Sequence, residues 1–255
     1  MIASLGMYDR AETAAANDRL WAGIRDGLRA RDIAAPEALT RGEGAYWAAW
    51  QAPDLVLSQT CGFPYRARLH GRVTLIGTPD YGVEGCPPGH YRSVFVTRAD
   101  DPRALADFDG LPLAYNEGLS QSGWAAPQNH AAGLGLRLRP GLCTGGHRLS
   151  ALAVAEGRAD LAALDAVTWE MLRRWEPAAP RLRVVAVTEP TPGLPYIAAR
   201  DQDADALFDC VAAAIAALGP GDRRSLHLKG LVRIPLGSYL AVPNPPSPEQ
   251  IAAAS

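Results

Sequence analysis

The stretch LAYNEGLSQSG, residues 113–123, decides the fold class of this 255-residue chain. It begins with Leu113–Tyr115, a short apolar segment of the kind that forms a buried strand in a parallel sheet. The polar turn that follows contains Ser120, Ser122 and Gly123, residue types that begin helices and let a backbone approach a ligand closely. A strand, a short turn and a helix in this order are typical of an α/β protein.

The same unit recurs along the chain. Apolar segments run into short polar turns at residues 7–9, 59–62 and 144–147. Helices are predicted over Thr13–Ala30, Leu149–Glu156 and Ala204–Leu218. Strands are predicted over Ile2–Met7, Leu55–Thr60, Val73–Thr78, Ser93–Thr97, Leu113–Tyr115, Leu161–Asp165, Val184–Thr188 and Tyr196–Ala199. We therefore predict mostly parallel sheets flanked by helices.

The domain organisation is predicted from the absence of a linker. No Gly- or Ser-rich stretch separates two consecutive domains. Instead, we interpret residues 98–101 and 189–195 as the two places where the chain crosses between the same pair of lobes. We predict a discontinuous first lobe, residues 1–97 plus 194–255, and an inserted second lobe, residues 98–193. Two crossing strands would form a hinge.

Charge and hydropathy exclude two classes of protein. The chain has 25 Lys and Arg residues against 27 Asp and Glu residues, a net charge of −2, and lacks the basic stripe of a nucleic-acid binder. Its longest apolar run, Cys210–Leu218, has nine residues. A membrane span needs about 20. We therefore expect neither a nucleic-acid partner nor membrane insertion.

Most cofactor and metal chemistries lack their motifs. Lys229 is the single lysine, so a Schiff-base mechanism would depend on that residue alone. The sequence has no P-loop, no zinc motif of the H-E-x-x-H or C-x-x-C type, and no G-x-G-x-x-G after a strand. Gly118–Ser122 resembles a nucleophile elbow but lacks its final glycine. We predict no cofactor, no metal site and no catalytic residue.

Three positions carry the strongest signal for ligand binding. Ser120, Ser122 and Gly123 combine hydroxyl groups with the backbone N–H groups of a helix start, which suits an oxyanion. The alternative is that the serines only cap the helix. His147 follows two glycines and is either aimed at the same anion or a structural histidine. Asp165 ends a predicted strand and is either a ligand contact or the cap of the next helix.

Several segments together resemble one known family. Tyr91–Val96 with the Asp-Asp-Pro turn after it is similar to a lobe-crossing strand, and Ser120–Gly123 matches a Ser-x-Ser-Gly anion turn. Gly146-His147 and the segment Gly157–Asp165 resemble a unit of histidine, helix, glycine and strand ending in Asp. The family is that of the phosphate, phosphite and phosphonate substrate-binding proteins of ABC transporters, which have the type II periplasmic-binding fold. The resemblance covers about residues 1–200.

The resemblance implies a two-lobed clamp that closes on a small oxyanion without reacting with it, with an ABC permease as partner. It implies that Ser120, Gln121, Ser122 and Gly123 hold the anion, that His147 donates to it, and that Asp165 reaches the rest of the ligand, for instance an amine. From the discontinuous lobe, Tyr8 and Thr60 would contribute.

Two other functions remain open at the level of sequence. Cytosolic enzymes use the same fold, including dehydratases and naphthoate-forming enzymes of the futalosine route to menaquinone. In such an enzyme His147 or Asp165 would act as general acid or base in a closed cleft. The second alternative is a ligand-sensing protein that uses the clamp as a switch.

The cellular compartment of the protein and the redox state of its cysteines depend on each other. The resemblance implies the periplasm, whereas the sequence starts MIASLGMYDR without a signal peptide, which predicts the cytoplasm if Met1 is the native start. Cys61 and Cys86 lie in two loops of the first lobe, and we predict a disulfide between them. Such a bond would favour an oxidising compartment.

Overall fold

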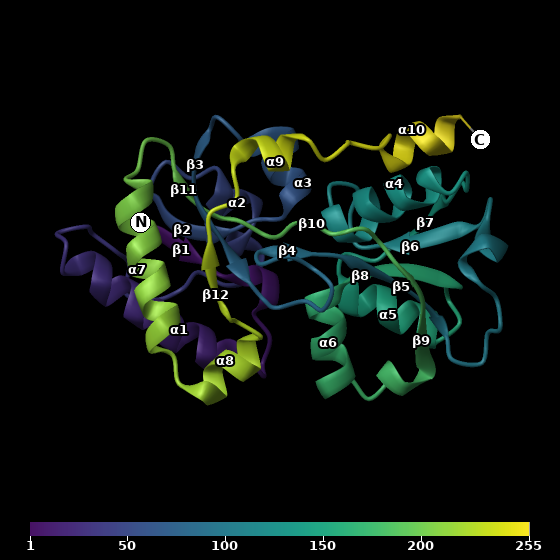
Figure 1. Cartoon of the computed structure of the whole chain (residues 1–255), viewed down its shortest axis with the longest axis horizontal. Helices are drawn as coiled ribbons and strands as arrows, with labels where there is room; N and C mark the ends of the chain where they lie inside the picture. The colour runs from purple at the N-terminus through teal and green to yellow at the C-terminus, as the bar shows by residue number, and fades with distance from the viewer. Residues whose placement is uncertain (255) are drawn as a thin grey trace. The chain divides into compact units, whose positions relative to one another are not determined.

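The computed structural model describes residues 1–254, which form two compact units (Figure 1). Unit 1 contains Met1–His90 and Pro192–Ala241, and unit 2 contains Tyr91–Thr191 and the chain from Val242 onward. Each unit is a five-stranded sheet with helices on both faces. The predicted α/β class, with sheets flanked by helices, is confirmed.

The sheet of unit 1 packs against helices on both sides. Its strand order is β1 (Ile2–Ser4), β2 (Leu55–Gln59), β11 (Tyr196–Ala199), β3 (Val73–Asp80) and β12 (Gly230–Val232). One face is covered by α1 (Ala14–Arg29), α7 (Ala204–Ala217) and α8 (Pro220–Leu226). The other face is covered by α2 (Trp47–Trp50), the π-helical turn η3 (Tyr65–Leu69) and α9 (Leu236–Leu240). Shorter elements are η1 (Gly6–Tyr8), η2 (Gly42–Ala45) and α3 (Gly62–Pro64).

The sheet of unit 2 has the strand order β7 (Arg139–Cys143), β6 (Pro112–Tyr115), β8 (Leu161–Asp165), β5 (Ser93–Arg98) and β9 (Leu182–Val187). A core around Phe95, Phe108 and Leu113 joins one face to η4 (Leu105–Phe108) and to α4 (Ala126–Gly133), which continues from the π-helical turn η5 (Gln121–Ala125). The opposite face is covered by α5 (His147–Ala155) and α6 (Ala166–Trp175). The unit also contains η6 (Ala179–Arg181) and α10 (Pro248–Ala253).

Strand direction corrects part of the prediction. In unit 2, β6 runs parallel to β7 and β8, and β9 has the same direction, but β5 is antiparallel to both of its neighbours. In unit 1, β11 is antiparallel to β2 and β3, and β12 is antiparallel to β3. Both β5 and β11 are the first strands of their sheets after the chain has passed from the other unit. Their apolar composition indicates burial but carries no information about direction.

Two strands of the five-stranded sheets were not predicted from the sequence, nor were the two short paired strands His90–Tyr91 and Thr191–Pro192. β7 reads Arg-Pro-Gly-Leu-Cys, and a proline and a glycine in five residues argue against a strand. β7 is an edge strand, where a residue without a backbone N–H is tolerated. β12 is also an edge strand and has only three residues.

The boundaries of the units differ from those of the predicted lobes. The chain passes between units at residues 90/91 and 191/192, within the short paired strands β4 (His90–Tyr91) and β10 (Thr191–Pro192). A third passage follows Ala241, so residues 242–254 belong to unit 2 and not to the discontinuous lobe. The reason is a set of contacts that join this segment to α4 and β7.

Among residues 1–254, no single helix is long and apolar enough to cross a membrane. Helices α7 and α8 reach the required length and composition only as a pair, and the chain bends by 114° between them.

Candidate functional site

Most of the predicted ligand residues lie at one end of the strands of the unit 2 sheet, which we call the site edge of that sheet. The carboxyl ends of β6, β7, β8 and β9 and the amino end of β5 meet there, as the register pairs Tyr115 with Cys143 and Ser93 with Asp165 establish. The turn Ser120–Gly123 follows β6, and His147 follows β7. Loops at the carboxyl ends of strands are where open α/β sheets bind ligands.

The two serines of the turn have different surroundings. Ser120 is the N-cap of η5, and its Oγ accepts the N–H of Gly123 at 3.0 Å, so the capping interpretation holds for this residue. Ser122 does not cap the helix. It is 2% exposed, and within residues 1–254 its backbone N–H donates to no other group. The backbone N–H of Ser122 is therefore available to a ligand. It lies at the start of η5 and α4, which form one continuous helical segment over residues 121–133.

The sharpest contact of the site joins Ser122 to His147. Ser122 Oγ lies 2.7 Å from His147 Nε2. Burial lowers the pKa of His147 from 6.5 to about 4, and the carbonyl of Ala163 opposes this only in part. The imidazole is therefore neutral at pH 7. The neutral ring carries one proton, and the tautomer decides whether Nε2 or the Ser122 hydroxyl is the donor of their hydrogen bond.

Gly123 is required by a neighbouring side chain. A Cβ added at Gly123 would lie 1.9 Å from Asn116 Oδ1 and 3.3 Å from His147 Cε1. The glycine thus makes room for Asn116 and the imidazole. Asn116 follows β6 directly, and its Oδ1 is buried without a hydrogen-bond partner among the described residues. Sequence reasoning missed Asn116, although its place after a strand of the α/β pattern is the signal that selected Ser120.

Asp165 is held as a helix cap. Its Oδ1 accepts the N–H groups of Val167 and Thr168 at 2.6 and 3.1 Å, at the start of α6. Opposite it on β5, Ser93 is 1% exposed, and its Oγ has no partner among residues 1–254. The capping interpretation of Asp165 is therefore correct, and its contact with a ligand stays a prediction. Ser93 was missed because it begins an apolar strand instead of following one.

Tyr8 and Thr60 belong to unit 1. They follow β1 and β2, at the edge of that sheet where the carboxyl ends of β1, β2 and β3 meet. Thr60 is fully buried, its N–H donates to the carbonyl of Pro195 at 3.0 Å, and its Oγ has no partner within residues 1–254. The ring of Tyr8 meets that of Tyr81 edge to face at 5.0 Å. Both stay predicted ligand residues.

The predicted disulfide is not formed. The structure has thiols at Cys61 and Cys86. Cys61 is buried at the N-cap of α3, where its side chain joins the interior of unit 1, whereas Cys86 is half-buried in the loop after β3. Two loops of one lobe made the bond feasible, but sequence alone did not specify the direction of either side chain.

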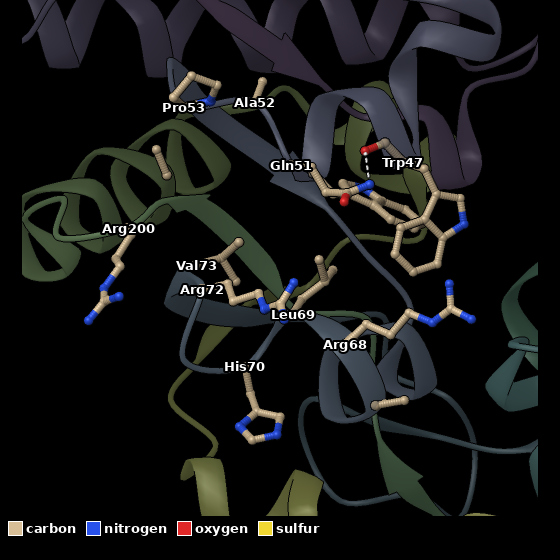
Figure 2. A pocket seen from close by; sticks show the side chains of 13 residues that line it. Trp47, Gln51, Ala52, Pro53, Arg68, Leu69, His70, Arg72, Val73 and Arg200 are labelled. Carbon is tan, nitrogen blue, oxygen red and sulfur yellow. Dashed lines mark hydrogen bonds between the residues drawn. The ribbon is translucent and has the colours of Figure 1, made fainter.

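Unit 1 also has a groove of about 1,100 Å³ at the opposite edge of its sheet, where β2 and β3 begin and β11 ends. Figure 2 shows Trp47 above Arg68, and His70, Arg72 and Arg200 also line the groove. None of the predicted ligand residues lines it. Among residues 1–254, no three His, Cys, Asp or Glu side chains are grouped as metal ligands.

The sequence model of one family matches residues 54–235: the periplasmic phosphonate substrate-binding proteins of ABC transporters. The chain belongs to this family. No curated protein sequence matches the chain. The matched residues include the Ser120–Gly123 turn, His147 and Asp165. These candidate ligand residues of the phosphonate-binding-protein family member therefore lie within the part of the chain that the family model covers.

Solved structures of this fold are similar over nearly the whole chain. PhnD1 from Prochlorococcus marinus, in complex with methylphosphonate, is 16% identical with a TM-score of 0.70, covering 93% of this chain and 94% of that one. The binding protein component PA3383 of an ABC phosphonate transporter from Pseudomonas aeruginosa is 16% identical with a TM-score of 0.67, covering 94% and 83%. XAC2383 from Xanthomonas citri, bound to chloride, is 17% identical with a TM-score of 0.65, covering 93% of each chain. At these identities the comparison establishes the type II periplasmic-binding fold.

Proposed function

We propose that the protein binds a small oxyanion of the phosphate, phosphite or phosphonate class at the Ser120–Gly123 turn, as the substrate-binding component of an ABC uptake system. The observation that carries this proposal is the partly buried contact of 2.7 Å between Ser122 and His147 at a helix start. Membership of the family supports the class of ligand and an ABC permease as partner.

The donors at this edge are all uncharged. Ser122 offers its hydroxyl and its backbone N–H, and the helix start adds about half a positive charge. His147 is neutral because of its lowered pKa and orients the hydroxyl. Hydrogen bonds from uncharged donors to an anion are individually strong, and they select an oxyanion by geometry. Tyr8 and Thr60 are proposed to add contacts from unit 1.

Related proteins carry different ligands, so the ligand needs a direct test. The Prochlorococcus protein was solved with methylphosphonate, XAC2383 with chloride and with ATP, and MatC from Rhodopseudomonas palustris with malate. Calorimetric titration with phosphate, phosphite, methylphosphonate, 2-aminoethylphosphonate, sulfate and malate separates these classes. Tightest binding of malate, or of sulfate alone, would contradict the proposed class.

Ser122→Ala is expected to weaken binding of the preferred oxyanion by about 1–2 kcal/mol, or about five- to thirtyfold. The substitution removes one hydroxyl donor to an anion, and the small side chain leaves the helix start in place. Isothermal titration calorimetry measures the difference. Ser225→Ala, in α8 of unit 1, is the matched control and should bind as the wild type does. Equal affinity of all three proteins would remove Ser122 from the site.

Gly123→Ala is expected to lower the affinity for the same oxyanion by about tenfold or more. The added Cβ would meet Asn116 Oδ1 at 1.9 Å and must displace that side chain, while His147 lies only 3.3 Å away. Titration calorimetry checks the affinity, with Gly133→Ala as control, because a Cβ at that position meets nothing within 4 Å. Wild-type affinity in Gly123→Ala would mean that Asn116 and His147 move without consequence for the ligand.

Catalysis is the second candidate, and the same contact favours it. A serine hydroxyl 2.7 Å from a neutral histidine has the geometry of a nucleophile and its base. In such pairs a third group, typically a carboxylate, orients the base, whereas among residues 1–254 the group that interacts with the His147 ring from behind is the backbone carbonyl of Ala163. Binding therefore has the stronger support. Covalent labelling of Ser122 by a fluorophosphonate, seen by peptide mass spectrometry, would reverse this preference.

A further inference from the structure

The segment that follows the third passage of the chain lies against the proposed binding turn. We name residues 242–254 the C-terminal strap. The strap begins Val-Pro-Asn-Pro-Pro-Ser-Pro, with four prolines in residues 242–248. Proline fixes the backbone in an extended form and leaves carbonyl groups without internal partners. Residues 242–247 have no regular secondary structure, and α10 begins after them, its start fixed by Ser247 and Gln250.

Two of these carbonyl groups accept hydrogen bonds from the helix that carries the turn. Trp124 Nε1 donates to the carbonyl of Pro246 at 3.0 Å, and Asn129 Nδ2 donates to that of Pro243 at 2.9 Å. At the start of the same turn, a Cβ added to Gly118 would lie 3.1 Å from Pro248. The strap thus contacts the segment on both sides of Ser120–Gly123.

Trp124 links the strap to the donors of the turn. It directly follows Gly123, is fully buried, and its ring packs at 4.9 Å from that of Tyr115 on β6. Its backbone N–H bonds the carbonyl of Ser120 at 3.2 Å, so the indole and the turn move together. The strap also contacts the other half of the site, because α10 packs against β7, the strand that leads to His147.

We infer that the C-terminal strap holds the Ser120–Gly123 turn in its binding geometry through Trp124, which makes Trp124 a positioning residue for the anion. The inference rests on the proposed function for its effect on affinity. The physical reason is preorganisation: a misplacement of about 1 Å is enough to weaken a set of directional hydrogen bonds severely. The C-terminal strap donates no hydrogen bond to the anion in this proposal. It sets the affinity by fixing the position of the donors in the Ser120–Gly123 turn.

Trp124→Phe tests the inference in the full chain, because it keeps an aromatic ring in the core and removes the indole N–H together with part of the ring system. We expect about a three- to tenfold loss of affinity for methylphosphonate, the usual range for one hydrogen bond. We also expect faster hydrogen exchange without ligand at the amides of Gly123, Trp124 and Ala125, which bond Ser120. Trp175→Phe, at the end of α6, is the matched control and should change neither.

A second variant separates the strap from local damage at Trp124. Asn129→Ala removes the other anchor, six residues beyond Gly123, and is expected to lower the affinity about twofold. If both anchors act through one strap, the double variant should lose less than the product of the two single losses. Independent effects, or no effect of Asn129→Ala on affinity and exchange, would overturn the inference.

The exchange measurement distinguishes the two proposals. Wild-type protein that binds no oxyanion, together with faster exchange in Trp124→Phe, would contradict the proposed function and support the holding role of the strap. Wild-type protein that binds methylphosphonate, with affinity and exchange unchanged in both variants, would contradict the strap alone.

Discussion

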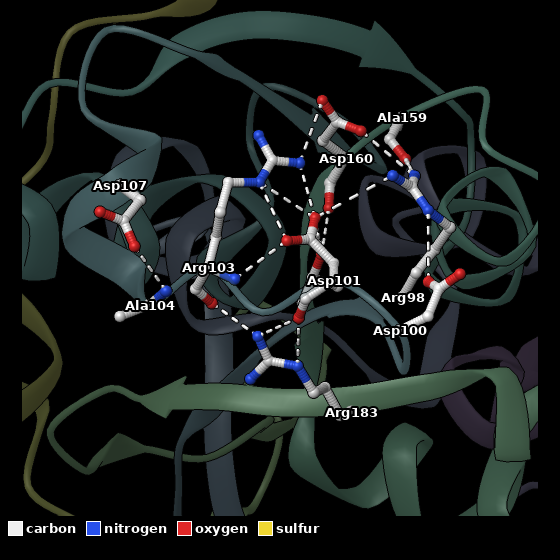
Figure 3. A network of polar contacts seen from close by, with 10 residues as sticks. Arg98, Asp100, Asp101, Arg103, Ala104, Asp107, Ala159, Asp160 and Arg183 are labelled. Carbon is white, nitrogen blue, oxygen red and sulfur yellow. Dashed lines mark hydrogen bonds and ion pairs between the residues drawn. The ribbon is translucent and has the colours of Figure 1, made fainter.

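Asp101→Asn is expected to lower the free energy of unfolding of unit 2 by about 2–3 kcal/mol. The carboxylate of Asp101 is 4% exposed and accepts a hydrogen bond from Arg103 Nη2 at 2.6 Å (Figure 3). It also accepts the hydroxyl of Thr97 at 3.1 Å. Its backbone carbonyl accepts Arg183 Nε at 2.7 Å. Asn keeps the shape but removes the nearer of the two carboxylates that pair with Arg103, leaving Asp160 at 3.4 Å. The effect is below the roughly 3–5 kcal/mol of a fully buried pair because Arg103 is 30% exposed.

The pH dependence of the free energy of unfolding shows whether the charge of the Asp101 carboxylate causes this effect. The hydrogen bond from Arg103 holds the pKa of Asp101 well below its usual range. A carboxylate with a lowered folded pKa stabilises the fold above its unfolded pKa of about 4, and that stability is lost as the pH falls below this value. Urea unfolding measured at a series of pH values should therefore give a flatter acid limb for Asp101→Asn. Asp107→Asn, at an exposed position of η4, is the control.

His147→Gln is expected to remove a second and separate reason why the free energy of unfolding falls at low pH. The folded pKa of His147 is about 4 against 6.5 for the free side chain. Between these values the unfolded chain binds a proton that the folded chain does not, so stability falls as the pH drops from about 6.5 to about 4. At about 1.4 kcal/mol per pKa unit, and because His147 is only partly buried as a residue, the expected loss is about 2–3 kcal/mol. Glutamine keeps a hydrogen-bonding group and does not titrate.

The measurement is again urea unfolding against pH, now above pH 4. The wild type should lose stability in this window, and His147→Gln should lose much less. His90→Gln in β4 is the control, with its ring near the protein surface. An identical slope in wild type and His147→Gln would show that His147 has the same pKa in the folded and unfolded chains, and the argument from a lowered pKa would then fail.

The site was predictable where its residues follow strands in a regular α/β pattern. Ser120, Ser122 and His147 were selected on that ground, and the structure places them at one sheet edge. Asn116 and Ser93 at the same edge were not selected. Their significance depends on burial and on register across β5 and β8, which are properties of the folded sheet.

Sequence by itself determined the α/β class, the positions of most strands and the helices α1, α5 and α7, because hydrophobic period and turn residues act over a few neighbouring positions. It also determined the residue types at the Ser120–Gly123 turn. Only the tertiary structure decided the direction of β5 and β11, the assignment of residues 242–254 to unit 2, and the thiol state of Cys61 and Cys86. These features rest on contacts between residues far apart in the chain. Such contacts depend on which surfaces meet after folding, and no local pattern encodes that choice.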